Sequence, residues 1–216
     1  MTVATLMDTL RRLPRWSVAA AILFTAKFFV LLALVASGVA GPADLAMTIA
    51  IQRVASDPLD LLANVETIVG QGTVTLVLAA ILAAVLWRRV GPVAALAPAL
   101  ILVTVPIELF FKSELQQPGP PREFIRSFHN LLGVHIETNA SFPSGHVARV
   151  TFLALTAASL YPRGWTPTAA SLFLVLAVFL RVYIGDHWIS DALGGLALGG
   201  AFASLAVGWI RASARR

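Results

Sequence analysis

Long apolar runs alternate with short polar segments along this chain. A helix needs roughly 20 mostly apolar residues to cross a bilayer, and six runs approach that length. They cover residues 16–38, 66–87, 92–111, 146–161, 166–184 and 188–210. The fourth run is short, and it becomes long enough only if its first turn starts at Ser144. Because no soluble domain fits between the runs, we predict a single all-α, polytopic membrane domain over residues 1–216 with six transmembrane helices.

Two of the polar segments, 43–55 and 123–133, carry a helical apolar pattern of their own. We predict that both form short interfacial helices, which lie along the headgroup layer on the outer side of the membrane. An ordinary packed loop helix is the alternative for each. The apolar positions are Leu45, Ile49 and Val54, expected to face inward, in the first segment and Phe124, Ile125, Phe128, Leu131 and Leu132 in the second.

The composition agrees with a membrane protein. Hydrophobic residues make up 58% of the chain and charged residues only 12%, whereas a soluble domain has about 25% charged residues. The chain has no cysteine, which excludes disulfides and thiolate metal sites. A net charge of +5 does not indicate nucleic-acid binding, because the basic residues lie at the ends of apolar runs and not in one patch.

The basic residues also predict the orientation of the helices. Clusters such as 11–15 and 88–89 flank the ends that this rule places in the cytoplasm, so we expect both termini there. The remaining polar loops would then face the outer side of a bacterial cell membrane. The first run is followed by "ASGVAG", as in a signal peptide, but it is longer and contains Lys27, so we expect an uncleaved helix. For Lys27 we expect a buried pair or a side chain that reaches the interface, not a catalytic role.

One group of polar residues surrounds the start of the sixth run, in "RVYIGDHWISD". His187 and Asp191 are one helical turn apart and share a face. A carboxylate beside an imidazole fixes its tautomer and leaves the other ring nitrogen free to act as a nucleophile. Arg181 precedes the turn between the fifth and sixth runs, within reach of the same place. The alternative is a structural His–Asp pair that caps the sixth run.

A second group is "PSGH", residues 143–146, at the start of the fourth run. Pro and Ser favour helix starts, Gly145 lets a ligand approach the backbone, and the free N–H groups of a helix start bind anions. His146 could donate a proton to a leaving group. Alone, this stretch is also compatible with a plain N-cap. Combined with Lys112 and His187 at the same membrane face, it indicates a phosphate site with a nucleophile, a general acid and positive side chains.

These residues resemble the motifs of the type 2 phosphatidic acid phosphatase (PAP2) superfamily. Its members carry Lys-x6-Arg-Pro, then Pro-Ser-Gly-His, then Ser-Arg-x5-His-x3-Asp. The second motif is intact at residues 143–146. The third is kept in Arg181, His187 and Asp191, with Leu180 where Ser is usual. The order, the spacing and the position at the outer ends of the runs all agree with the family.

The resemblance implies a role for each matched residue. His187 would be the nucleophile that forms a phosphohistidine, Asp191 would orient it, and His146 would protonate the departing oxygen. A water molecule would then hydrolyse the phosphoenzyme. Family members need no metal and no other cofactor, so we expect none here. The phosphoryl oxygens would be held by Lys112, Arg181, Ser144 and the backbone of Gly145.

The first motif is broken in this chain. Lys112 and Pro120 keep the register, but Gly119 stands where the motif has Arg. Arg122 could replace that arginine if the turn before it folds inward; otherwise it faces the headgroups. Arg126 is a weaker candidate for the same role.

Three further features lie near the motifs. Glu108 precedes Lys112 by one helical turn and would position it. Arg149, one turn beyond His146, could line the edge of the pocket or form an ion pair with a loop carboxylate. Gly195 and Gly199 form a small-xxx-small face that favours close helix packing.

The leading functional hypothesis is the removal of a phosphate or diphosphate group from a membrane lipid at the outer face. The best single substrate is an isoprenoid diphosphate such as undecaprenyl diphosphate, with phosphatidic acid, phosphatidylglycerol phosphate and a lipid A phosphate as alternatives. Transfer of the phosphoryl group to another lipid is a second hypothesis. A catalytically impaired lipid-binding protein is a third, which the intact His146, His187 and Asp191 disfavour. The lipid bilayer and the lipid phosphate are thus the expected partners, and nucleic acid is not.

Overall fold

The structure is a computed structural model that describes residues 3–126, 140–161 and 164–214. Within these ranges every regular element is a helix, as the apolar runs predict. The α-helices are α1 (Val3–Arg11), α2 (Arg15–Ala36), α3 (Gly41–Gln52), α4 (Asp57–Val69), α5 (Gly72–Arg89), α6 (Ile101–Leu115), α7 (Gly145–Ala158), α8 (Thr166–Tyr183) and α9 (Ile189–Ser213). Two 3-10 helices, η1 (Ala94–Leu100) and η2 (Arg122–Phe124), precede and follow α6.

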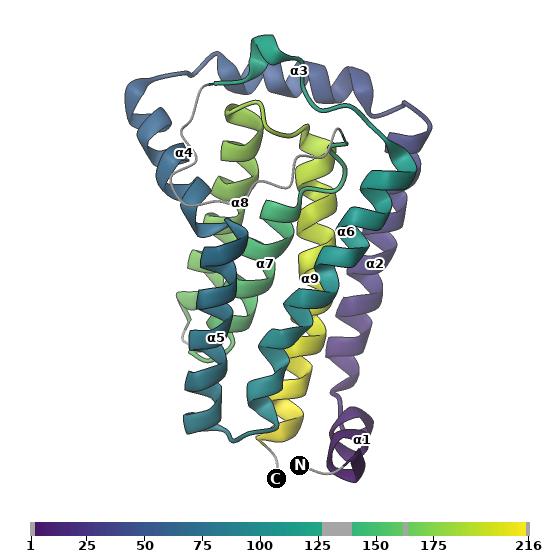
Figure 1. Ribbon diagram of the computed structural model, residues 1–216, viewed down its shortest axis with the longest axis vertical. Helices are drawn as coiled ribbons and strands as arrows, with labels where there is room; N and C mark the ends of the chain where they lie inside the picture. Colours follow the sequence, from purple (N-terminus) through teal and green to yellow (C-terminus); the bar gives the residue numbers. More distant parts are fainter. Residues whose placement is uncertain (1–2, 127–139, 162–163, 215–216) are drawn as a thin grey trace.

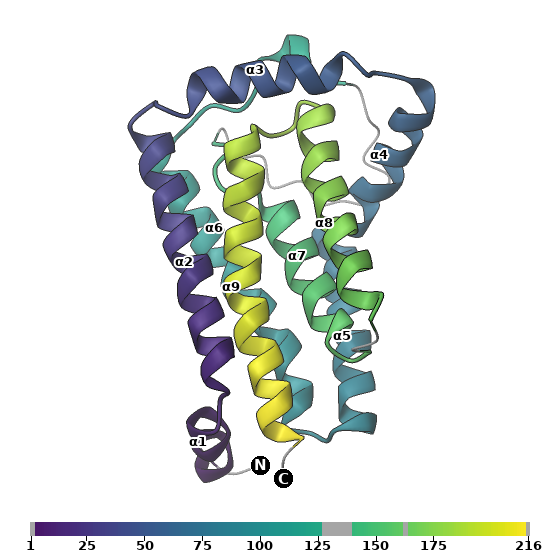
Figure 2. The same cartoon turned by 180° about the vertical axis from the view of Figure 1, so that it is seen from behind.

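The long helices form an elongated bundle (Figure 1). Helices α2, α5, α6, α8 and α9 run along its long axis, and α3 crosses over one end. Both chain termini lie at the other end (Figure 2). In both views α7 lies in the middle of the bundle, where it packs against α8 and α9.

Five of the described helices are long and apolar enough to cross a membrane. They correspond to the first, second, third, fifth and sixth predicted spans, with η1 and α6 together forming the third. The remaining candidate, α7, has 14 residues and is about 21 Å long, less than the roughly 30 Å of a bilayer core. The all-helical membrane fold is therefore confirmed, and the count of six spanning helices is not.

The second predicted span begins later than the apolar pattern suggested. We expected a helix from residue 66, but residues 66–69 end α4, and α5 begins at Gly72. At the break between the two helices, a Cβ atom on Gly70 would collide with the ring of His146. The break thus brings the end of α4 against the start of α7, and it places Glu66 beside the predicted site.

Helix α3 confirms the predicted short helix over 43–55, but the predicted inward face was wrong. Leu45, Ile49 and Val54 are exposed, whereas Asp44 and Thr48 are buried. Asp44 faces inward because its two carboxylate oxygens accept hydrogen bonds from the backbone N–H and the side chain of Ser190, at 2.9 and 2.8 Å. Helix α3 is therefore fixed to the start of α9 by polar contacts.

The second predicted interfacial helix, over 123–133, lies mostly outside the described residues. The described part departs from the prediction, because η2 ends at Phe124 and Ile125 has an extended backbone. The N–H of Arg126 bonds instead to the carbonyl of Ile184, at 3.0 Å. This segment is therefore held against the turn after α8.

The small-residue face of α9 packs as predicted. A Cβ atom on Gly195 would collide with the carbonyl oxygen of Ser144, and one on Gly199 with that of Ala148. The backbones of α9 and α7 can approach this closely only because both positions lack a side chain. Through this contact α9 sets the position of the PSGH segment.

Lys27 lies on the exposed surface of α2. Its ammonium group is 5.6 Å from the centre of the Phe24 ring, a distance at which a cation is attracted to the face of an aromatic ring. It is absent from the residues that line the predicted site.

Candidate active site

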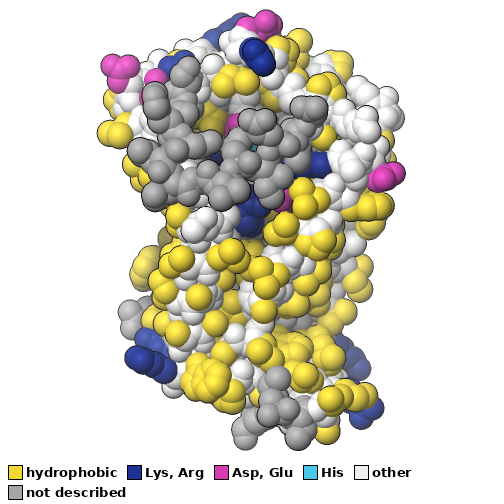
Figure 3. All heavy atoms as spheres, viewed as in Figure 1, with side chains coloured by type: hydrophobic (Ala, Val, Ile, Leu, Met, Phe, Trp, Pro, Cys, Tyr) yellow, Lys and Arg dark blue, Asp and Glu magenta, His cyan; other side chains and the backbone are white. Residues whose placement is uncertain are grey.

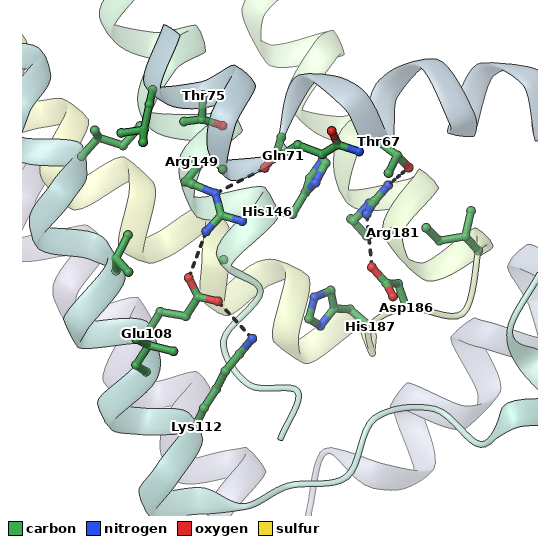
Figure 4. A pocket seen from close by; sticks show the side chains of 18 of the residues that line it. Thr67, Gln71, Thr75, Glu108, Lys112, His146, Arg149, Arg181, Asp186 and His187 are labelled. Carbon is green, nitrogen blue, oxygen red and sulfur yellow. Dashed lines mark hydrogen bonds and ion pairs between the residues drawn. The ribbon is translucent and has the colours of Figure 1, made fainter. Parts of the chain in front are cut away.

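A pocket of about 760 Å³ opens between α5 and α6 and reaches inward to α7 and α8. Its inner part is polar and contains most of the predicted site (Figure 4). Its outer part is apolar, and Leu76 of α5 and Leu102 of α6 are both more than half exposed there. The charged and imidazole side chains that matter for its chemistry are Glu108, Lys112, His146, Arg149, Arg181 and His187.

His146 and Arg181 share one buried carboxylate, that of Glu66. Glu66 Oε1 lies 2.8 Å from His146 Nε2, and Oε2 lies 3.2 Å from the Arg181 guanidinium. Arg181 also contacts the Thr67 hydroxyl and, at 3.2 Å, Asp186. Because these contacts fix the guanidinium, Arg181 is held rigidly at the wall of the pocket.

His187 is linked to Asp191 through a third residue, Ser141. His187 Nδ1 lies 3.0 Å from Ser141 Oγ, and that hydroxyl is hydrogen-bonded to Asp191. The direct distance from Nδ1 to the Asp191 carboxylate is 3.6 Å. Asp191 also accepts a hydrogen bond from the backbone N–H of Trp188, at 2.9 Å, and so caps α9. The carboxylate therefore serves both the helix start and the imidazole, whose polar contacts with Ser141 and Asp191 are made through Nδ1.

A second carboxylate, Glu108 of α6, is shared by two cations. Its oxygens lie 3.0 Å from Lys112 Nζ and 3.1 Å from the Arg149 guanidinium. The predicted Glu108–Lys112 pair is therefore present. Arg149 both lines the pocket and forms an ion pair, although its partner is on a helix and not on a loop.

The PSGH segment starts α7 as predicted. The Ser144 hydroxyl accepts a hydrogen bond from the N–H of Val147 at 3.4 Å, which makes Ser144 the N-cap, and its side chain is fully buried. Gly145 and His146 line the pocket. Ser144 thus caps the start of α7 from a position behind the pocket lining.

The predicted site residues fall into three groups. The first group lines the pocket and consists of Lys112, Gly145, His146, Arg181 and His187. The second group, Asp191 and Ser144, is buried directly behind it. Arg122, the proposed substitute for the missing motif arginine, is exposed in η2 and does not line the pocket.

Arg126 lines the pocket but is engaged elsewhere. Two nitrogens of its guanidinium bond both carboxylate oxygens of Asp60, at 2.9 and 2.7 Å. The pKa of Asp60 is held below its ordinary value, chiefly by the hydrogen bond from Arg126 and to a smaller extent by one from Tyr183.

The sequence did not reveal Glu66 or Ser141 as members of the site. Glu66 carried one weak signal, since a carboxylate at the edge of an apolar run is costly unless it has a partner. Ser141 carried none, because a serine ahead of an N-cap is common in any loop. Among the described residues no three His, Asp or Glu side chains are grouped so that they could hold a metal ion.

The fold and the site together define a class of protein: a helical membrane protein whose bundle encloses a pocket lined by two histidines and several cationic side chains. The family model of the PAP2 superfamily matches residues 74–215. The chain therefore belongs to the PAP2 superfamily.

One curated protein and one solved structure are also similar to this chain. The chain is 36% identical over 104 residues to a protein of Escherichia coli (strain K12) called "Putative undecaprenyl-diphosphatase YbjG". That match covers 46% of this chain and 50% of the relative, so the chain spans about half the length of the curated relative it matches. A crystal structure of a transmembrane PAP2-type phosphatidylglycerolphosphate phosphatase from Bacillus subtilis has the same fold. The TM-score is 0.72 at 21% identity, over 87% of this chain and 94% of that one.

Proposed function

We propose that this protein removes a phosphate or diphosphate group from a membrane lipid by way of a phosphohistidine at His187. The observation that carries the proposal is the pocket itself. Two imidazoles, each tied to a carboxylate, line the same cavity as Lys112 and Arg181, and its mouth is apolar. A polar chamber with an apolar entrance fits an amphiphile whose phosphate enters while its tail stays in the lipid.

The geometry supports a two-step reaction. In the first step Nε2 of His187 attacks the terminal phosphorus, and the bond from that phosphorus to the oxygen of the leaving lipid alcohol, or of the leaving lipid monophosphate for a diphosphate, breaks. His146 gives a proton to that departing oxygen. In the second step the oxygen of a water molecule attacks the same phosphorus, and His146 takes a proton from the water. The phosphorus–nitrogen bond breaks, which restores His187 and releases inorganic phosphate. Lys112 and Arg181 stabilise the charge on the phosphoryl oxygens in both steps.

For the substrate we favour an isoprenoid diphosphate such as undecaprenyl diphosphate. The name of the Escherichia coli relative supports this choice. Phosphatidylglycerol phosphate is the main alternative, which the name of the Bacillus subtilis protein supports. Phosphatidic acid and a lipid A phosphate remain further alternatives, because the pocket residues contact the phosphate and not the tail. Transfer to an acceptor lipid in place of water is the alternative reaction.

For the location we propose a bacterial inner (cell) membrane, with both termini in the cytoplasm and the pocket toward the outer side. The two termini do lie at one end of the bundle, and the pocket lies toward the other end, beneath α3. The basic clusters near the termini support the cytoplasmic assignment of that end.

Phosphate release by the purified protein from a panel of lipid phosphates and diphosphates tests the function. Wild type should release phosphate with and without EDTA, and His187→Ala should release none. Equal release by the two proteins on every substrate would overturn the enzymatic proposal, and loss of activity in EDTA would overturn the metal-free mechanism. A labelled acceptor lipid distinguishes transfer from hydrolysis.

A further inference from the structure

The side chain of Glu108 is placed where a substrate anion is expected. Figure 4 shows its carboxylate between Lys112, on the same helix, and Arg149, which reaches across from α7. One carboxylate therefore faces two cations. With all three groups ionised, this cluster carries an excess positive charge and attracts a further anion.

The carboxylate also lies against the start of α7. A Cβ atom on Gly145 would collide with both carboxylate oxygens of Glu108, so these oxygens lie directly over the Gly145 backbone. The first N–H groups of a helix have no partner within the helix and carry partial positive charge, which favours an anion. Two cations and a helix start thus converge on one carboxylate, whose two oxygens stand in for two oxygens of a phosphate.

The burial of this cluster explains why its two cations need an anion beside them. The side chains of Glu108 and Lys112 are each 11% exposed, and that of Arg149 is 20% exposed. Two cations so poorly exposed to water, and close to each other, are costly without a counter-ion. A phosphate group carries about two negative charges and three strong acceptor oxygens, so it can satisfy both cations better than one carboxylate does.

We propose that Glu108 is an exchangeable counter-ion of a phosphate subsite, displaced when a phosphate group binds Lys112 and Arg149. Arg149 then supplies the contact that the motif arginine would make. Position 119 cannot supply it, because Gly119 has no side chain. The assignment deepens the proposed function and rests on it for the identity of the ligand as a phosphate group.

Binding of inorganic phosphate to the purified protein, measured by calorimetry in detergent, tests the subsite without any turnover. Glu108→Gln should lower the dissociation constant about tenfold, because it frees two cations. Arg149→Gln should raise it about tenfold, and Arg149→Lys should lie between wild type and Arg149→Gln. In the double variant the gain from Glu108→Gln should shrink, because the two residues share the ligand.

Glu114→Gln and Arg53→Gln are matched controls, since both residues are exposed and lie outside the pocket. They should bind phosphate as wild type does. Weaker binding by Glu108→Gln would overturn the proposal, because it would mean that Glu108 only holds Lys112 in place. Unchanged binding by Arg149→Gln would overturn it too. If Arg149→Gln does not fold, Arg149→Lys takes its place, provided that its unfolding temperature equals that of wild type. Wild-type phosphate binding by Arg149→Lys would then overturn the proposal.

The two proposals fail separately. Lipid hydrolysis is assayed in parallel on the same preparations. If wild type binds phosphate with the expected pattern across the variants but hydrolyses no lipid phosphate, the proposed function is wrong and the subsite stands. If lipids are hydrolysed but the variants bind phosphate like wild type, the subsite is wrong and the function stands.

Discussion

At the scale of single residues, each acidic side chain behind the two histidines serves more than one partner. Glu66 contacts both His146 and Arg181, and Asp191 serves both Ser141 and the start of α9. A buried group that loses its partner costs more than the hydrogen bond was worth. Neutralising Glu66 or Asp191 should therefore shift the site residues that these carboxylates hold, although the substitution leaves those residues unchanged.

Glu66→Gln should lower kcat by about tenfold to a hundredfold, because His146 is then held less accurately as the proton donor. The KM should change less, since the variant leaves the proposed phosphate contacts of Lys112 and Arg149 in place. Steady-state kinetics on the best lipid substrate gives both constants. Glu114→Gln on α6 is the control and should match wild type. A rise in KM with an unchanged kcat would show that Glu66 serves binding instead.

At the scale of elements, the contact between α7 and α9 determines where the site begins. Gly199 lies against the carbonyl of Ala148, and Gly195 against that of Ser144. These neighbours are backbone atoms, which cannot move aside as the end of a flexible side chain can. The helix that begins with the PSGH segment is therefore positioned by glycines that lie outside the pocket lining.

Gly199→Ala should lower the stability of the protein by about 1 to 3 kcal/mol, since the added methyl group overpacks the helix interface. The midpoint of thermal unfolding in detergent measures this effect. Gly41→Ala, whose new methyl group meets nothing within 4 Å, should leave the midpoint nearly unchanged. Equal midpoints for the two variants would contradict the proposed role of the interface.

The ion pair between Asp60 and Arg126 ties α4 to the segment after η2, and it should make stability depend on pH. The pKa of Asp60 is lowered in the folded state, chiefly by the hydrogen bond from Arg126. Its contribution is therefore fully present above the ordinary carboxyl pKa of about 4 and is lost as the pH falls through the lower folded-state pKa. Asp60→Asn should unfold at a lower temperature than wild type at pH 7, and this difference should shrink in acid. A difference that stays constant with pH would rule out the pair as its source.

At the scale of the whole molecule, the charged side chains are unevenly distributed along the bundle axis. Figure 3 shows basic side chains at the lower end, a wide hydrophobic band, and charged side chains of both signs in the upper half. The polar chamber is embedded in this upper half, and its apolar mouth faces the side of the bundle between α5 and α6. Under the proposed function, a lipid phosphate would enter the chamber sideways from the membrane, without crossing it.

Because the chain contains no cysteine, single cysteines report the orientation without background. In intact cells a membrane-impermeant maleimide should label Arg53→Cys, at the end of α3, but not Arg12→Cys, near the N-terminus. Permeabilised cells should show labelling at both positions, which controls for reactivity. The reverse pattern in intact cells would place the pocket on the cytoplasmic side.

The sequence by itself determined the helical membrane fold and the motif residues of the site. Bilayer thickness sets the length of an apolar run, and the motif residues are recognised by their spacing along the chain, so both follow from local rules. The predicted shared helix face of His187 and Asp191 was wrong, because α9 begins only at Ile189 and His187 lies in the turn before it. Only the tertiary structure decided which further groups serve them. Glu66 lies 80 residues from His146, Ser141 lies 46 from His187, and Glu108 lies 41 from Arg149. Such contacts depend on how α4, α6 and the turn before α9 pack around the start of α7, and no local pattern encodes that packing.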